Sequence, residues 1–223
     1  MRKIFKCLNN LRWYISIFFT KDLFYFYIYL LEIYKKIKIG KGCRISILAD
    51  ISGNVITGDH VRIERWSVIK GNVKIGDYTL IRAYAYITTN PTGYIKIGKH
   101  CHINLFNVIG RCKKVIIKDH ALFATGVKIT DSSHNCTYFE LPIKSTPIIS
   151  EDVIIEKNVW LGFDVCVIIG GGIRRNSIIG AKPLVNKKFL LIQLLLEYLQ
   201  KFIKREIFCI KSEITGGINF VKI

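Results

Sequence analysis

Histidine is the side chain best suited to exchanging a proton near neutral pH, and one histidine of this chain has an unusual position. His134 lies in TDSSHNCTYFELPIKSTPIIS (130–150), the longest interruption of a repeat that otherwise runs through most of the sequence. A histidine in such a segment is a candidate general base towards a hydroxyl group within hydrogen-bond reach. The alternative is an exposed loop histidine with no chemical role.

Three further histidines raise a different chemistry. His60, His100 and His120 each follow an anchor of the repeat by three positions, where we expect outward-facing corners. Three histidines can form a zinc ligand set, so a metal-dependent reaction is one interpretation of them. A zinc site of this kind would also pair two histidines in one loop, and His134 has no second histidine near it in its own segment. We therefore expect no catalytic metal.

The repeat that positions these residues has a period of six. Every sixth residue from Ile39 to Ile87 is isoleucine except Thr57, and the positions four after each anchor hold small or β-branched residues. The register resumes at Ile97 after four extra residues, at Ile117 after two more, and at Ile155 after the long excursion. An antiparallel sheet would instead show an alternation of two.

A fixed period of six predicts a parallel β-helix. Each hexad is one face of a triangular prism with one large aliphatic residue pointing inwards, and three hexads make an 18-residue coil whose corners need small residues. Coils bury their inner faces only by stacking on one another. We therefore expect an all-β domain over residues 37–189 with about seven coils, interrupted by a catalytic loop at 130–154.

The composition limits the partners and the compartment. The formal net charge is +18, which favours an anionic partner such as nucleic acid, a membrane surface or a phosphorylated small molecule. No nucleic-acid-binding motif is present, so we expect no nucleic-acid partner. The seven cysteines are odd in number and form no C-x-x-C pair, which favours a reducing cytoplasm over a disulfide framework or a zinc knuckle.

The first 36 residues form a separate segment. Residues 13–34 are strongly apolar and aromatic but are interrupted by Lys21 and Asp22, and no signal-peptide cleavage pattern follows. We expect residues 1–36 to be helical and either to pack on the body of the protein or to lie at the inner face of the membrane, where the lysines at 35, 36 and 38 would meet the headgroups. A single spanning helix is the alternative.

The segment IIEKNVWLGFDVCVIIGGGIRRNSIIGAKPLV (154–185) resembles the hexapeptide-repeat (left-handed β-helix) acyltransferase family. Within it, the maltose/galactoside and the capsule or exopolysaccharide O-acetyltransferases are most similar. The resemblance implies a left-handed helix, a homotrimer with active sites between neighbouring prisms, and direct transfer from acetyl-CoA to a sugar or glycan hydroxyl in surface polysaccharide biosynthesis. N-acetylation of an amino-sugar nucleotide and a non-catalytic or decayed β-helix stay open as alternatives.

The resemblance also implies roles for individual residues. His134 would be the catalytic base, and Asn104 would bind the acceptor or the developing oxyanion. Asp131 is assigned only from its proximity in sequence, as a residue that would orient His134. Residues matching the coenzyme A groove are Trp160 and Gly162 beside the thioester and pantetheine arm, Ala181, Asn186 and Lys187 near the far end, and Lys204 at the phosphates.

The sequence departs from the family pattern near its end. In NKKFLLIQLLLEYLQKFIKRE (186–206) the flanks agree with the family, but the middle lacks the expected prolines and G-x-P-A turn. One base deleted from a family-like F-P-P-N-T-I-V-A-G-I-P-A coding sequence can read as residues 189–200, which suggests a compensated double frameshift. We expect residues 190–200 to favour an apolar helix, within a helical or irregular tail at 190–223.

Overall fold

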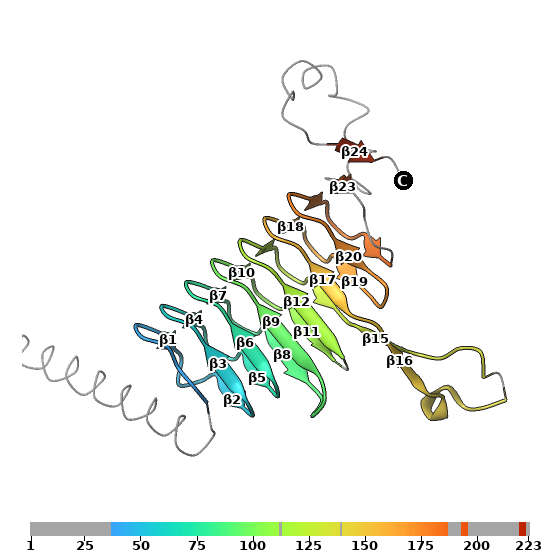
Figure 1. The fold of residues 1–223 in the computed structure, drawn as a ribbon, viewed down its shortest axis with the longest axis horizontal. Helices are drawn as coiled ribbons and strands as arrows, with labels where there is room; N and C mark the ends of the chain where they lie inside the picture. Colours follow the sequence, from blue (N-terminus) through green and yellow to red (C-terminus); the bar gives the residue numbers. More distant parts are fainter. Residues whose placement is uncertain (1–36, 112, 139, 187–192, 196–218, 222–223) are drawn as a thin grey trace, which may run out of the picture.

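The structure, a computed structural model, describes residues 37–111, 113–138, 140–186, 193–195 and 219–221. These residues form the predicted left-handed parallel β-helix (Figure 1). Each coil supplies one short strand to each of three parallel sheets, named here sheets 1, 2 and 3 in chain order, and sheet 2 contains seven strands. The described coils therefore number about seven, as the hexads predicted.

The strands are short because each prism face is only one hexad long. Sheet 1 contains β1 (Arg44–Ile45), β4 (Arg62–Ile63), β7 (Leu80–Ile81), β10 (His102–Ile103), β13 (Leu122–Phe123), β18 (Trp160–Leu161), β21 (Ile178–Ile179), β23 (Gln193–Leu195) and β24 (Asn219–Val221). Sheet 2 contains β2 (Asp50–Ser52), β5 (Val68–Lys70), β8 (Tyr86–Thr89), β11 (Val108–Arg111), β14 (Lys128–Ile129), β19 (Cys166–Val167) and β22 (Leu184–Val185). Sheet 3 contains β3 (Val55–Thr57), β6 (Val73–Ile75), β9 (Tyr94–Ile97), β12 (Lys114–Ile117), β17 (Val153–Ile155) and β20 (Gly172–Ile173).

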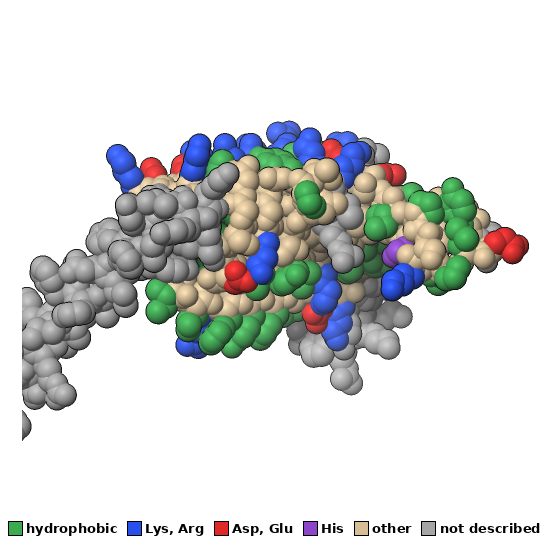
Figure 2. All heavy atoms as spheres, turned by 90° about the horizontal axis from the view of Figure 1, so that it is seen from below, with side chains coloured by type: hydrophobic (Ala, Val, Ile, Leu, Met, Phe, Trp, Pro, Cys, Tyr) green, Lys and Arg blue, Asp and Glu red, His purple; other side chains and the backbone are tan. Residues whose placement is uncertain are grey.

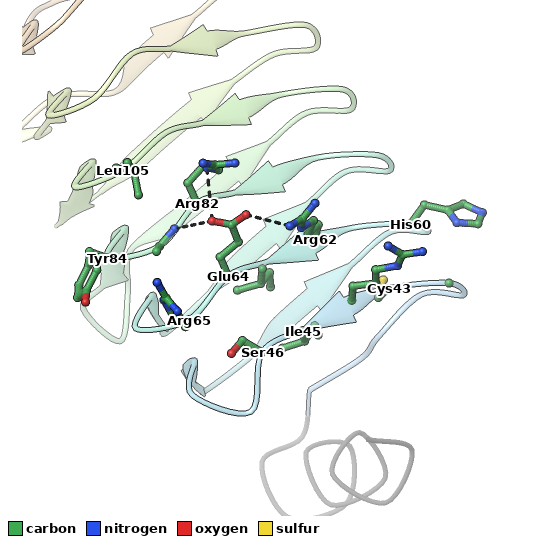
Figure 3. Close-up of a pocket in the computed structure, with 14 residues that line it drawn as sticks. Cys43, Ile45, Ser46, His60, Arg62, Glu64, Arg65, Arg82, Tyr84 and Leu105 are labelled. Carbon is green, nitrogen blue, oxygen red and sulfur yellow. Dashed lines mark hydrogen bonds and ion pairs between the residues drawn. The ribbon is translucent and has the colours of Figure 1, made fainter. Parts of the chain in front are cut away.

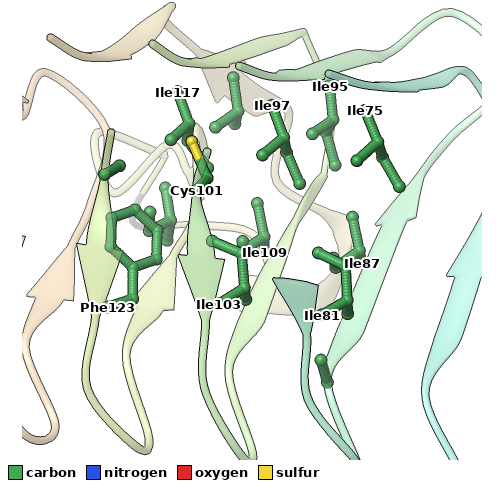
Figure 4. Packing of buried hydrophobic residues seen from close by; sticks show 14 of the residues in the cluster. Ile75, Ile81, Ile87, Ile95, Ile97, Cys101, Ile103, Ile109, Ile117 and Phe123 are labelled. Carbon is green, nitrogen blue, oxygen red and sulfur yellow. The ribbon is translucent and has the colours of Figure 1, made fainter. Parts of the chain in front are cut away.

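The anchors of the repeat form the core. Every anchor from Ile45 to Val185 is buried, and Ile39 packs against the same cluster while remaining partly buried. Figure 4 shows the isoleucines of successive coils lying one above another inside the prism, with Phe123 as the one aromatic ring labelled among them. Thr57 fits this position because its hydroxyl accepts a hydrogen bond from the Gly40 N–H at 3.1 Å.

The extra residues that interrupt the register all lie at one corner of the prism. Ile63 pairs with Ile81 across 18 residues, whereas Ile81 pairs with Ile103 across 22, because the turn between β8 and β9 is longer. The same corner, between sheets 2 and 3, is where the excursion at 130–150 leaves the prism. The coils therefore stay in register, and the insertion extends outwards.

Aromatic side chains occupy the other two corners in left-handed backbone conformation. His60, Tyr78, His100 and His120 have φ between 53° and 61° and stack on one another with ring centroids 4.8–5.1 Å apart. The histidines thus lie at outward corners, as predicted, with their rings face to face rather than converging on one point. Among the residues that the structure describes, no group of three His, Cys, Asp or Glu side chains could hold a metal ion.

Cys101 should resist alkylation in the folded protein. Its thiol is 2% exposed, and burial raises the pKa of the thiol to about 11. The reactive thiolate is therefore scarce at pH 8, whereas Cys136 is exposed on the surface. After brief iodoacetamide treatment at pH 8, peptide mass spectrometry should find Cys136 modified and Cys101 unmodified. Both should react in denaturant; equal modification of the two in the folded protein would refute this assignment.

Parts of the sequence prediction lie outside the described residues. These are the N-terminal segment 1–36 and the two coenzyme A candidates Lys187 and Lys204. No helix in the described part of the chain has the length and hydrophobicity to cross a membrane.

The predicted apolar helix at 190–200 is wrong for its described residues. Gln193–Leu195 form β23, which pairs in parallel with β21 through Ile178 and Leu194, and β24 pairs with β23 in turn. A physical reason is that β21 at the end of sheet 1 presents unpaired N–H and C=O groups, which a further strand can satisfy. This tertiary pairing outweighs the helix propensity of the leucine-rich segment.

Candidate active site

The excursion that carries His134 is a β-hairpin that projects from the prism. β15 (Ser132–His134) and β16 (Ile148–Ser150) pair antiparallel, with His134 opposite Ile148, and residues 132–150 are named the arm here. A short 3-10 helix, η1 (Ile143–Ser145), lies near its far end. Figure 1 shows the arm extending away from the three sheets, so His134 is held on a structured extension rather than against the flat face of a sheet.

His134 is exposed and is fixed through one ring nitrogen. Its Nδ1 lies 3.2 Å from the hydroxyl Oγ1 of Thr146, which is itself only 6% exposed. The same hydroxyl donates a hydrogen bond to the Ile143 carbonyl at 2.7 Å. Sequence reasoning missed Thr146, because the contact joins residues twelve positions apart and depends on how the hairpin closes.

Asp131 lies at the base of the arm and supports the corner. It is 1% exposed, and its Oδ2 accepts hydrogen bonds from the backbone N–H groups of Lys113 and Lys114, both at 2.7 Å. Charge-assisted bonds of this kind tie the base of the arm to the preceding coil. The side-chain contact of His134 Nδ1 is with Thr146. The role predicted for Asp131 in orienting His134 stays a prediction.

Asn104 belongs to a row of side chains along one edge of sheet 1. The row is named here for five residues that each directly follow a paired anchor: Glu64, Arg82, Asn104, Ala124 and Gly162. Asn104 is half-buried, and its Oδ1 accepts a hydrogen bond from the Leu105 N–H at 2.9 Å. Neighbouring strands are about 4.8 Å apart, so Asn104 lies two strands, roughly 10 Å, from Gly162.

Charged residues continue this row towards the N-terminal coils. Glu64 pairs with Arg62 at 3.2 Å and with Arg82 at 3.4 Å, and its Oε2 also accepts from the Ala83 N–H at 3.3 Å. Figure 3 shows the Glu64 carboxylate between the two arginines, in an open depression on the prism surface. The hexad rule would have located Glu64 and Arg82, because both stand one position after an anchor, but their pairing is visible only in the structure.

His102 is another residue that the sequence reasoning overlooked. It precedes the anchor Ile103 on β10 and is partly buried. Burial lowers the pKa of His102 below its ordinary value, and the nearby Arg82 charge lowers it further, while Glu64 acts in the opposite direction. A lowered pKa favours the neutral form of the His102 imidazole, which lies beside the polar row.

Trp160 and Gly162 lie on the same sheet but offer no backbone N–H to a ligand. The Trp160 N–H donates to Ser177 O at 3.0 Å and the Gly162 N–H to Ile179 O at 2.8 Å, both within the stacked coils. A Cβ on Gly162 would come 2.8 Å from the backbone of Gly180, so coil stacking alone accounts for the glycine. What remains available to a ligand is the half-exposed indole ring of Trp160.

The two remaining described candidates lie in the last coil. Ala181 follows β21 and is partly buried, and Asn186 follows β22 and is exposed. Both are near the C-terminal end of the prism, but Ala181 lies at the corner between sheets 1 and 2, whereas Asn186 follows the sheet 2 strand and lies towards sheet 3. The role of these two residues in binding coenzyme A stays a prediction.

Among the described residues, the predicted base and the predicted acceptor-binding residue lie apart within one chain. His134 projects from the corner between sheets 2 and 3, whereas the row containing Asn104 and Gly162 borders the corner between sheets 1 and 2. The predicted residues of one copy of the chain are therefore divided between different corners of the prism.

Comparison with known proteins identifies the repeat. Residues 54–89 match the model of the bacterial transferase hexapeptide (six repeats). A probable acetyltransferase of Mycobacterium tuberculosis is 31% identical over 93 residues, which are 42% of this chain and 31% of that protein. The chain thus spans about a third of the length of the curated relative that it matches.

The chain is also similar to solved structures, at lower sequence identity. A maltose O-acetyltransferase from Clostridium difficile 630 is 27% identical, with 45% of this chain and 52% of that chain covered and a TM-score of 0.41. The N-acyltransferase AntD from Bacillus cereus, in complex with dTDP and 3-hydroxybutyryl-CoA, is 20% identical, with 72% and 77% covered and a TM-score of 0.48. The chain forms a β-helix, and its residues 54–89 match the hexapeptide repeats of bacterial transferases.

Proposed function

We propose that this protein is an acyltransferase that moves an acetyl group from acetyl-CoA to a hydroxyl of a sugar or glycan. The observation that carries the proposal is the position of His134, exposed on an ordered arm with one ring nitrogen engaged by Thr146. An imidazole held in this way suits a general base. The bacterial transferase repeat and the acetyltransferase relative support the reaction class.

The reaction would proceed by direct transfer. His134 takes the proton from the acceptor hydroxyl as its oxygen attacks the thioester carbonyl carbon. The C–S bond then breaks, and the coenzyme A thiolate leaves and recovers the proton from the imidazolium. A side-chain amide such as that of Asn104 could stabilise the oxyanion that forms in between. No covalent acyl-enzyme is required, so no nucleophilic serine or cysteine is assigned.

We also propose that the working unit is a homotrimer. His134 and the Asn104 row lie at different corners, so a site containing both needs a neighbouring copy. The arm presents a set of exposed apolar side chains, visible in Figure 2 on the projecting part of the molecule: Tyr138, Leu141, Ile143, Ile148 and Ile149. Clustered exposed apolar groups of this kind favour association. Light scattering should give three times the chain mass of 25.7 kDa; a monomer would contradict this proposal.

The cellular location is a further proposal. The +18 charge and the apolar residues 13–34 support a cytoplasmic protein in peripheral contact with the inner face of the membrane. Co-sedimentation with vesicles containing anionic lipid should be lost when residues 1–36 are removed. Equal sedimentation of the full-length and shortened chains would contradict membrane contact through this segment.

Thiol release from acetyl-CoA in the presence of candidate acceptors tests the function. One set of acceptors contains sugars and glycans with hydroxyl groups only, and the other contains amino-sugar nucleotides. We expect release with the first set and a product ester that mild base cleaves. A base-stable amide formed only with the second set would favour N-acetylation. Failure with both sets would favour the non-catalytic alternative, and resequencing the DNA for residues 189–200 would then test for decay.

A further inference from the structure

Thr146 is buried on an arm whose other side chains are largely exposed. It is 6% exposed, whereas Ile143 is 73% and Ile148 is 56% exposed. Its hydroxyl Oγ1 contacts the Ile143 carbonyl oxygen at 2.7 Å and His134 Nδ1 at 3.2 Å. Thr146 therefore connects the candidate base to the backbone of the opposite side of the arm.

The two contacts of this hydroxyl determine where the protons are. A threonine hydroxyl has a single hydrogen to donate, and a carbonyl oxygen can only accept. The hydrogen is therefore committed to Ile143 O, and Oγ1 can only accept from His134. Nδ1 must then carry the proton, and in a neutral imidazole this leaves the lone pair on Nε2.

We propose that Thr146 is a positioning residue that holds His134 in the Nδ1–H tautomer, so that Nε2 is the atom that takes the proton from the acceptor. This inference rests on the proposed acyl transfer for its catalytic meaning, but the tautomer itself does not. During the reaction Nε2 gains the hydroxyl proton and returns it to the departing thiolate sulfur. Nδ1 keeps its proton throughout, and Thr146 Oγ1 faces the positive imidazolium with a lone pair.

The local sequence builds this arrangement from rigid parts. Thr146 follows η1, which begins after Pro142, and Pro147 favours the extended conformation that Thr146 adopts at φ −72° and ψ 146°. The Thr146 N–H also donates to Ile143 O at 3.1 Å, which closes the turn. Opposite it, the Asn135 N–H donates to Pro147 O at 2.9 Å and fixes the strand that carries His134.

The tautomer can be measured without any substrate. In ¹⁵N-histidine-labelled protein, long-range ¹H–¹⁵N correlation spectra at a pH where His134 is neutral distinguish a protonated ring nitrogen from an unprotonated one. His134→Gln assigns the signals. We expect a protonated Nδ1 and an unprotonated Nε2 in the wild type, and a shift towards the Nε2–H form in Thr146→Val. A wild type with Nε2–H would overturn the proposal.

Kinetics separate positioning from simple support of the arm. Thr146→Val should lower kcat about 10- to 100-fold with little change in KM, and Thr146→Ser should recover most of the rate because it restores the hydroxyl. Thr137→Val is the matched control, since Thr137 is an exposed arm residue whose hydroxyl bonds Asn135; its rate should match the wild type. Wild-type kcat in Thr146→Val, or no recovery in Thr146→Ser, would contradict the role. An inactive wild type with the expected tautomer would instead refute the proposed function alone.

Discussion

Replacing His134 with alanine is expected to reduce acetyl transfer by about 10²- to 10⁴-fold, the usual contribution of a general base. The reduction should appear in kcat, because the imidazole removes a proton in the transition state and contributes little to binding acetyl-CoA. The rate of thiol release at saturating acetyl-CoA and acceptor measures it. Imidazole added to the buffer should restore part of the rate if the space left by the side chain admits it.

A histidine outside the arm provides the control. His120 is exposed at the corner between sheets 3 and 1 and stacks on His100 at 5.1 Å, so it shares residue type and exposure with His134 but not its position. His120→Ala should keep a rate within about twofold of the wild type, a change of under 1 kcal/mol in the barrier. If His134→Ala were equally active, the base would have to be another group.

Phe123→Ala should destabilise the protein by about 3–5 kcal/mol, the usual cost of removing a buried aromatic ring from a core. Phe123 is fully buried on β13, between Ile103 and Leu161 of the neighbouring coils. The cavity would lie in the middle of the coil stack, where the coils on both sides lose contacts. Urea titration followed by circular dichroism measures the change in the free energy of unfolding.

An exposed phenylalanine separates this core effect from a general effect of the substitution. Phe163 is 60% exposed at the edge of sheet 1, so Phe163→Ala should change the free energy of unfolding by less than about 0.5 kcal/mol. Phe123→Leu should fall between the two, because leucine fills part of the cavity. Equal stability of Phe123→Ala and the wild type would contradict the stacked-core account.

The core could be predicted from the sequence because a single rule determines it. One aliphatic side chain per hexad must point inwards, so Ile51 and Val185 were both identifiable as core residues from their register alone, and both are fully buried. The rule needs no long-range information, because stacking repeats the same contact in each coil. In the described part of the chain it did not extend past the end of the repeat, where Gln193–Leu195 lack a hexad signature yet form a strand against β21.

The candidate site was less predictable, because its contacts cross the repeat. The position of His134 followed from its segment, but its Thr146 partner depends on the hairpin pairing His134 opposite Ile148. The expected orienting residue, Asp131, was chosen for its proximity in sequence. Its carboxylate accepts hydrogen bonds from the backbone of the previous coil, and its role towards His134 stays a prediction. Similarly, the backbone N–H of Trp160 donates to Ser177 O within the coil stack. A resemblance in residue type does not reveal this hydrogen bond.

The central claim is direct, histidine-assisted transfer of an acetyl group, and isotope labelling tests it most directly. The protein is incubated with acetyl-CoA carrying ¹³C in the acetyl group and with an acceptor, and both acceptor and protein are weighed by mass spectrometry. The account predicts labelled acceptor, unlabelled protein, and a loss of acceptor labelling in His134→Ala. Label retained on the wild-type protein, or equal labelling of the acceptor by wild type and His134→Ala, would contradict it.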